Sequence, residues 1–255
     1  MNARTYVFSA VALLLPAMAF AGQPLETESA RLAKAGTGEL EMTYEYQTSS
    51  EGTEISAPMA VEYGLSDRLE VMVEPVFYTA IRPKSGRKAT GLGDTEVTLT
   101  WLASQETDKL PAIALAGEVK LPTAKDSMIG TGKTDYSATA IASKRFGKLD
   151  THFNLTYSIL GAPSGVKLSN VYSFALAGEY ALDQRWDLVG EAFTTTDAHA
   201  KATLGGVVSQ EIAGAETVGM LGARYHISPA VTFALGITYD NNNALLFRPG
   251  VTYKF

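Results

Sequence analysis

The chain ends with the stretch Gly250-Val251-Thr252-Tyr253-Lys254-Phe255, in which apolar and polar side chains alternate. Alternation with a period of two predicts a β-strand with one apolar face, formed here by Val251, Tyr253 and Phe255. The last of these is a carboxyl-terminal phenylalanine. The same alternation recurs along most of the chain, so the sequence predicts an all-β protein.

About twelve strands are expected from this pattern, many of them near the ten residues that a tilted membrane-crossing strand needs. They cover residues 39–48, 54–65, 69–79, 94–103, 112–121, 135–146, 151–160, 171–182, 186–195, 216–227, 231–240 and 245–255. Short turns fall at residues 66–68, 105–111, 147–150, 183–185 and 228–230. The alternate connections are longer loops at residues 80–93, 122–134, 161–170 and 196–215, with brief ones at 49–53 and 241–244. An alternation of short and long connections is typical of an even-stranded membrane barrel with both termini on the side of the short turns. A soluble sandwich has no reason to keep such a sequence of connection lengths.

The first 21 residues have the features of a secretory signal peptide. Arg4 precedes an apolar run over residues 7–20, and the small residues Ala19 and Ala21 occupy the −3 and −1 positions before Gly22, where cleavage is expected. The final strand is similar to the terminal strand of bacterial outer-membrane β-barrels, in which Val251, Tyr253 and Phe255 would serve as the assembly signal. We therefore expect a cleaved leader (residues 1–21), an amino-terminal segment (22–38) and a single antiparallel outer-membrane barrel (39–255). Its short turns would be periplasmic and its longer loops extracellular, and its partners would include outer-membrane lipid and the barrel-assembly machinery.

Composition excludes several other classes. The chain contains no cysteine, so a disulfide scaffold, a thiolate metal site and a cysteine nucleophile are all excluded. A formal charge of −6 disfavours general nucleic-acid binding. After the leader, no apolar stretch is long enough to cross a bilayer as a helix. We expect no cofactor, no metal site and no enzymatic activity.

Residue parity along the strands predicts a polar, mainly acidic lumen. Outward positions are apolar, for example Phe153 and Leu155, whereas the opposite parity carries charged groups that water in a lumen can solvate. The expected lumen-lining residues are Glu62, Glu70, Glu74, Glu96, Glu118, Arg224 and Arg248. One interpretation is a passage that favours cations or neutral polar solutes over anions. The other is a closed barrel in which the carboxylates pair with Arg224, Arg248 and Lys120 and stiffen the wall.

Residues 22–38 are the only stretch with a helical pattern, which would form one or two amphipathic turns. Two interpretations are open for this segment: a mobile periplasmic tail, or a plug that folds into the lumen.

Two loop features bear on surface binding and catalysis. Arg82, Lys84, Arg87 and Lys88 would face lipopolysaccharide phosphates in the outer leaflet. His199 lies in a long loop with Asp197 and Ser209, as the outer-rim histidines of barrel hydrolases do. No second motif surrounds it, so we expect a solvent-exposed histidine and no catalytic residue.

An ordered set of short motifs resembles a known family. These are Gly91-Leu92-Gly93-Asp94, Lys120-Leu121-Pro122-Thr123, Gly130-Thr131-Gly132-Lys133-Thr134-Asp135, Ala142-Ser143-Lys144-Arg145-Phe146-Gly147 and the terminal strand. The set resembles the outer-membrane family labelled as associated with the meta-cleavage pathway of phenol degradation, although Ala124 stands where the family usually has Gly. The resemblance implies an outer-membrane transporter for passive passage of small molecules, aromatic or other hydrophobic compounds among them. It brings no catalytic or binding residues.

Overall fold

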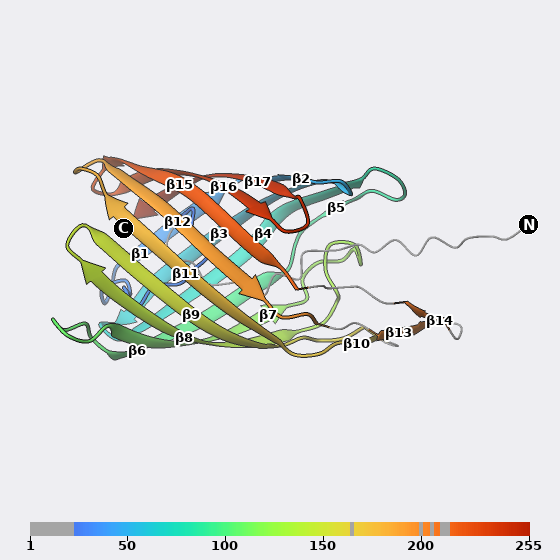
Figure 1. The fold of residues 1–255 in the computed structure, drawn as a ribbon, viewed down its shortest axis with the longest axis horizontal. Coiled ribbons are helices and arrows are strands. Elements are labelled where there is room, and N and C mark those ends of the chain that lie inside the picture. The colour runs from blue at the N-terminus through green and yellow to red at the C-terminus, as the bar shows by residue number, and fades with distance from the viewer. Residues whose placement is uncertain (1–22, 164–165, 199–200, 205–206, 210–214) are drawn as a thin grey trace, which may run out of the picture.

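Twelve long antiparallel strands close into a barrel (Figure 1). The computed structural model describes residues 23–163, 166–198, 201–204, 207–209 and 215–255. The expected leader and His199 lie outside the described residues. No helix in the described part of the chain is long and apolar enough to span a membrane.

The strands follow one another around the barrel in chain order. The elements are β1 (Gly38–Thr43), β2 (Glu45–Thr48), β3 (Gly52–Ser66), β4 (Leu69–Pro83), β5 (Ala89–Gly91), β6 (Thr95–Ser104), β7 (Ala112–Leu121), β8 (Asp135–Phe146), β9 (Leu149–Ile159), β10 (Val166–Lys167), β11 (Val171–Ala181), β12 (Trp186–Thr195), β13 (Lys201–Leu204), β14 (Val207–Ser209), β15 (Thr217–Ser228), β16 (Val231–Asp240) and β17 (Leu245–Lys254). β1 and β2 are two halves of the first barrel strand, and β5 pairs with the far end of β4. β10, β13 and β14 form a separate small sheet.

The barrel closes where the first strand meets the last. β17 pairs with β1 from Glu39↔Lys254 to Thr43↔Gly250 and with β2 farther along. Tyr44, between the two halves, donates its backbone N–H to Pro249 at 3.0 Å. Gly38 and Phe255 exchange backbone hydrogen bonds of 2.8 and 2.9 Å at the end of the seam. Among the described residues, closure gives each of the twelve long strands a neighbour on both sides, as a membrane barrel requires.

Side chains are arranged as in a membrane barrel, with apolar groups outside and polar groups inside. Large apolar residues on the outer parity are exposed, among them Phe77, Leu115, Phe153, Leu176 and Ile237. The intervening residues on the same strands are buried, and many of these are polar. This distribution confirms the expected parity on the strands that were used to predict it.

The two ends of the barrel differ. Short turns join β3 to β4, β8 to β9, β11 to β12 and β15 to β16, and they lie at the same end as Gly38 and Phe255 (Figure 1). We call this the turn end, and the opposite end the loop end. The wall extends farther toward the loop end than predicted, because β3 and β4 each have 15 residues. At this end β3 begins two residues before the predicted residue 54, and β4 ends four residues after the predicted residue 79. The short strands β5, β10, β13 and β14 were not predicted at all.

Candidate functional site

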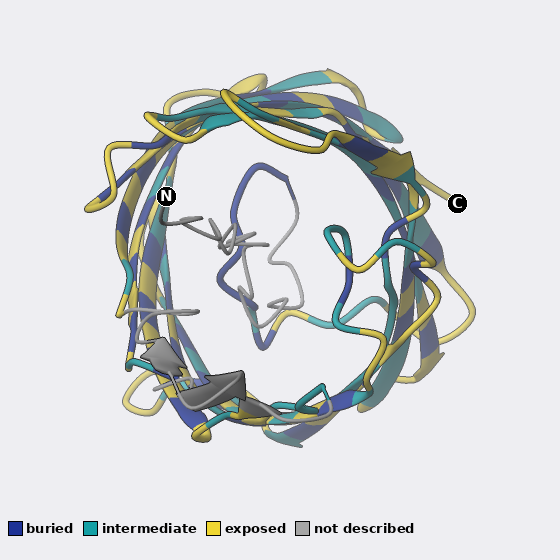
Figure 2. Cartoon of the chain, turned by 90° about the vertical axis from the view of Figure 1, so that its right-hand side faces the viewer, coloured by how far each residue is buried: buried dark blue, intermediate teal, exposed yellow. Residues whose placement is uncertain are grey.

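A stretch of chain runs inside the barrel. Residues 23–35, which we call the luminal segment, lie within the ring of strands (Figure 2). Much of this segment is buried, and Leu25 and Thr27 are fully so. It contains no helix, so the prediction of one or two amphipathic helical turns is wrong for these residues. Residues 23–35 thus lie where a plug, one of the two interpretations of residues 22–38, would lie.

Side chains that point into the lumen accept hydrogen bonds from backbone N–H groups of the segment. Glu191 of β12 accepts hydrogen bonds from the N–H groups of Glu26 and Thr27 at 2.9 Å, and also from the Thr27 hydroxyl at 2.8 Å. Ser143 of β8 accepts from the N–H of Ala30 at 2.8 Å, and Glu70 of β4 accepts from Ala33. Because unpaired buried backbone groups are costly, these contacts fix the course of the segment.

Asn154 of β9 makes a two-point contact with the segment. Its side-chain amide accepts from the N–H of Glu28 and donates to the C=O of the same residue. The amide therefore pairs with the backbone of Glu28 much as a neighbouring strand would.

Two arginines hold the first residues of the segment. Arg248 of β17 pairs with the side chains of Glu26 and Glu45, and Arg224 of β15 donates from Nε to the C=O of Gln23 at 2.5 Å. Arg224 also pairs with Glu179 at 2.7 Å. A buried charge needs such partners, so each arginine joins the segment to the wall.

Glycines in the wall make room for the segment. A Cβ at Gly236 would lie 2.8 Å from the side chain of Pro24, and one at Gly64 would lie 2.2 Å from the backbone oxygen of Lys34. Gly64 also exchanges backbone hydrogen bonds with Gly36 and Thr37, where the chain leaves the lumen for β1. Any larger residue at these two positions would collide with the segment.

Apolar contacts add to the polar ones. Leu25 packs in a buried cluster with Ala177, Val189 and Met220. Burying a leucine side chain contributes roughly 1.5–3 kcal/mol. Farther along, Ala30 and Leu32 pack against a second luminal cluster that includes Ile141. The segment thus contacts the wall on several sides.

At the turn end, Arg31 connects the segment to the turn between β6 and β7. Its guanidinium lies 2.5 Å from Glu106 and 2.9 Å from Asp150. The backbone N–H of Arg145, together with the side chains of Arg31 and Lys144, lowers the pKa of Glu106 to about 2. Glu106 therefore stays ionised at neutral pH and holds Arg31 by charge-assisted hydrogen bonds.

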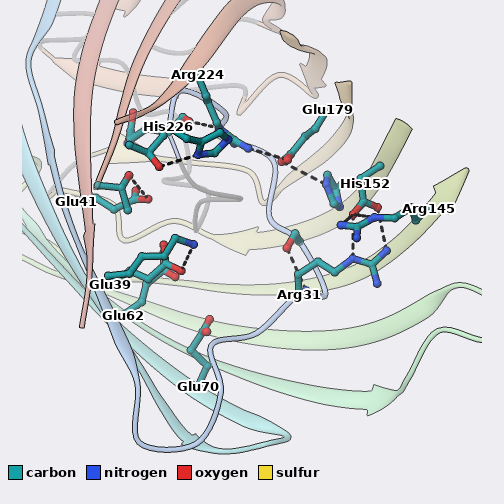
Figure 3. Close-up of a pocket in the computed structure, with 16 residues that line it drawn as sticks. Arg31, Glu39, Glu41, Glu62, Glu70, Arg145, His152, Glu179, Arg224 and His226 are labelled. Carbon is teal, nitrogen blue, oxygen red and sulfur yellow. Dashed lines mark hydrogen bonds and ion pairs between the residues drawn. The ribbon is translucent and has the colours of Figure 1, made fainter. Parts of the chain in front are cut away.

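A cavity of about 230 Å³ lies between the segment and the wall at the turn end. Figure 3 shows Glu39, Glu41, Glu62 and Glu70 on one side of it, across from Arg31, Arg145 and His152. A second cavity, beside Glu26, measures about 20 Å³, which is room for roughly one water.

The predicted lumen residues divide into two groups. Glu62, Glu70 and Arg224 line the larger cavity. Glu74 and Glu96 are direct cross-strand partners on β4 and β6, and Glu118 is buried on β7. Lys120 lies opposite Glu96 and pairs with Asp94 and Asp135 at 3.0 and 2.9 Å. The basic residues therefore neutralise part of the lumen, while several glutamates have no ion-pair partner in the described structure.

The predicted basic loop lies at the loop end, and Arg82, Lys84, Arg87 and Lys88 are all exposed there. Arg87 is already paired, since its guanidinium contacts both carboxylate oxygens of Asp126 at 2.5 and 2.6 Å. This contact lowers the pKa of Asp126 to about 2. Arg87 is therefore less available to an outside phosphate than its three neighbours.

Two described histidines lie near the turn end. His152 is buried between Ser143, at 2.8 Å, and Glu179, at 3.4 Å. His226 lies 2.7 Å from Asp187 and 3.1 Å from Thr232. Of the third histidine's expected neighbours, Asp197 is described, but the side chain of Ser209 is not.

Several residues that hold the luminal segment were not predicted from the sequence, chiefly Asn154, Ser143, Glu106 and Asp150. A signal for two of them was present. Asn154 alternates with the outward Phe153 and Leu155, and Ser143 has the inward parity on its own strand. Two polar residues on neighbouring inward faces could have indicated a contact inside the lumen.

The closed wall, the polar lumen and the unequal ends define an outer-membrane β-barrel, whose turn end is periplasmic. Among solved structures, the chain is similar to an outer membrane channel from Pseudomonas putida F1, with a TM-score of 0.70 and 14% identity over 89% of this chain and 98% of that one. It is also similar to the KdgM porin, with a TM-score of 0.56 and 10% identity over 84% and 99% of the two chains. A third is the translocator domain of NalP from Neisseria meningitidis, with a TM-score of 0.50 and 10% identity over 88% and 90%. At such low identity, these likenesses show the fold.

The family model described as "Putative MetA-pathway of phenol degradation" matches residues 21–255, and the chain belongs to this family. This confirms the resemblance carried by the motifs. A comparison with curated proteins gives no match.

Proposed function

We propose that the protein is an outer-membrane channel for passive passage of small molecules, with the luminal segment restricting its lumen. One observation carries the proposal: the segment is held by side chains of the wall, and strand-like pairing begins at its end, where Ala35 bridges to Gly64. Side-chain contacts can be exchanged one at a time, so the segment can move while the barrel stays closed. The likeness to an outer membrane channel and to a porin supports the same role.

The acidic wall sets the expected solute preference. Glu74 and Glu96 face each other across β4 and β6, and the nearby Lys120 is shared with two aspartates. A pathway past these groups favours cations and neutral solutes over anions. The family description supports aromatic or other hydrophobic compounds as candidate solutes.

Single-channel conductance in planar bilayers tests the proposal. The refolded protein would be compared with a variant that lacks residues 23–33. The deletion stops there because Gly36 and Gly38 bond to Gly64 and Phe255 in the wall. We expect low or intermittent conductance from the full chain and a larger, steady conductance from the deletion variant. Silence from both would sink the channel proposal.

A closed structural barrel is the alternative, and the buried ion pairs of Arg248 and Lys120 favour it. In this case the exposed Arg82, Lys84 and Lys88 would bind lipopolysaccharide phosphates at the loop end. Swelling of proteoliposomes separates the two functions, because a closed barrel admits no solute even after the deletion.

A further inference from the structure

The 230 Å³ cavity at the turn end combines groups of both charges, but these are not evenly matched. Glu39 pairs with Lys254 at 2.7 Å, and Glu179 pairs with Arg224 at 2.7 Å. Asp150 is bonded by Arg31 and Arg145. The arginines and the lysine of the lining are thus each engaged with a carboxylate.

Three carboxylates remain. Glu41, Glu62 and Glu70 line the same cavity and have no ion-pair partner among the described residues. Glu41 accepts a hydrogen bond from Thr252 at 3.2 Å, and Glu70 accepts one from the backbone of Ala33. Neither contact supplies a positive charge, so this side of the cavity stays acidic.

Unsatisfied acceptors occur at the same place. Oε2 of Glu41 and Oε1 of Glu62 have no hydrogen-bond donor in the described structure, and neither has Oε1 of Gln23. Glu41 is only 1% exposed and Gln23 only 3%. Gln23 carries no charge of its own, so its unpaired oxygen is independent of the acidic cluster. Buried acceptors without donors are costly, and three around one cavity indicate a ligand that donates.

The ligand must supply both positive charge and several N–H groups. A primary ammonium group meets both requirements, because it carries one charge and three donors. A bare metal ion fits less well: the described residues contain no group of three or more His, Asp or Glu side chains placed to hold one. The cavity is also large enough for several heavy atoms beyond the ammonium nitrogen.

We infer that this cavity is a binding site for a small organic cation with a primary ammonium group, held by Glu41, Glu62 and the side-chain oxygen of Gln23. The inference deepens the proposed function by naming a ligand class for the same lumen. It also places the ligand in contact with the luminal segment, because Gln23 belongs to that segment. Binding would therefore be coupled to the position of the segment.

Isothermal titration calorimetry of the refolded protein in detergent tests the inference, with n-butylammonium chloride as the probe. Tetramethylammonium chloride has the same charge but no N–H donor, and potassium and calcium chloride test simple cations. We expect saturable binding of n-butylammonium and affinities about tenfold or more weaker for the other salts, the change expected on losing one charge-assisted hydrogen bond.

Variants locate the site. Combining Glu41→Gln with Glu62→Gln keeps the side-chain shapes and removes two charges, and we expect it to weaken n-butylammonium binding by about tenfold or more. Glu118→Gln is the matched control, since this buried carboxylate lies outside the cavity lining. Heat-modifiable mobility on gels verifies that each variant is folded.

Three results would overturn the inference: no saturable heat from n-butylammonium, equal affinity for tetramethylammonium or a metal ion, or equal weakening by Glu118→Gln. The ligand series uses the unmodified protein and so does not depend on any variant folding. Failure of the channel proposal shows separately, as absent conductance in bilayers. Binding of n-butylammonium without conductance would support the binding site and contradict the channel. Conductance without binding would support the channel and contradict the binding site.

Discussion

The side-chain amide of Asn154 forms two hydrogen bonds with the backbone of Glu28: Oδ1 accepts from the N–H at 2.6 Å and Nδ2 donates to the C=O at 2.9 Å. Both residues are buried. The contact lies at the middle of the luminal segment, where the chain has no strand neighbour. Asn154 is therefore one of the wall residues that fix the position of the segment, and it acts at the middle of it.

Replacing Asn154 by Ala should loosen the segment, because it leaves two buried backbone groups unpaired at a cost of about 1–3 kcal/mol each. Hydrogen exchange in a peptide that covers residues 23–33 should become faster by about tenfold or more. Thr156→Val is the control, since Thr156 has the same inward parity but bonds to Thr139 of the wall. Equal exchange rates in the two variants would contradict the role given to Asn154.

Gly236→Ala should displace Pro24, because the added Cβ would lie 2.8 Å from the proline side chain. Overpacking of this kind costs about 1–3 kcal/mol, which shifts an equilibrium between two positions of the segment by about 5- to 150-fold. Conductance in bilayers should rise accordingly. Gly219→Ala on the neighbouring strand is the control, since its Cβ would meet no atom within 4 Å. If both variants conduct like the unmodified protein, Pro24 does not restrict the lumen.

The contact between Arg31 and Glu106 should persist across the physiological pH range. The pKa of Glu106 is lowered to about 2 by the N–H of Arg145, by Arg31 and by Lys144. For a carboxylate with a lowered pKa, the stabilising effect is fully present above the ordinary pKa of about 4.3 and is lost as the pH falls toward the folded-state value. Glu106→Gln should therefore accelerate exchange in residues 23–33 at pH 5 to 8. Below about pH 2, where both forms are neutral, the difference should disappear.

Replacing Glu74 and Glu96 together by Gln should reduce the preference for cations in the variant without residues 23–33. Each unit charge contributes about 1 kcal/mol at 4 Å in water, so the permeability ratio should change by up to about fivefold per charge. Reversal potentials under a salt gradient measure it. The exposed Glu51 provides the control substitution, Glu51→Gln. An unchanged reversal potential in the double variant would argue against an acidic pathway.

Phe255→Ala should lower the yield of assembled barrel in cells while leaving the refolded barrel stable. The side chain of Phe255 is exposed on the outer face, and the backbone bonds between Phe255 and Gly38 remain after the substitution. Heat-modifiable protein in outer-membrane fractions measures the yield, with Phe247→Ala on the same strand as the control. Equal yields would contradict a role for Phe255 in the assembly signal.

Period-two alternation, together with the alternating lengths of the connections, was sufficient to predict a barrel of about twelve strands. It also predicts which side chains of a strand face outward. This signal is local, and a membrane barrel repeats it in every strand. At the loop end, the predicted strands were too short, because β3 begins at Gly52 and β4 continues to Pro83, in stretches where the sequence alternates less clearly. The first strand is also divided at Tyr44 into β1 and β2, a division that the sequence pattern does not show.

The contents of the lumen were much harder to predict. The contacts of the luminal segment join residues far apart in the chain, such as Glu28 with Asn154 and Ala30 with Ser143. No periodic pattern encodes such pairs. Parity predicts that Glu62, Glu70 and Arg224 face the lumen, but it could not show that Arg224 is engaged with Glu179 and the segment.

The backbone contacts of Gly36 and Gly38 with the wall have a kinetic consequence. A luminal segment that leaves its site remains covalently tethered at the periplasmic rim, a few residues from where it was bound. Rebinding is then intramolecular, with an effective concentration that reaches the millimolar range for short flexible tethers. The rate at which the segment returns to the lumen would therefore not depend on the concentration of the protein, and no second protein would be needed to close the barrel.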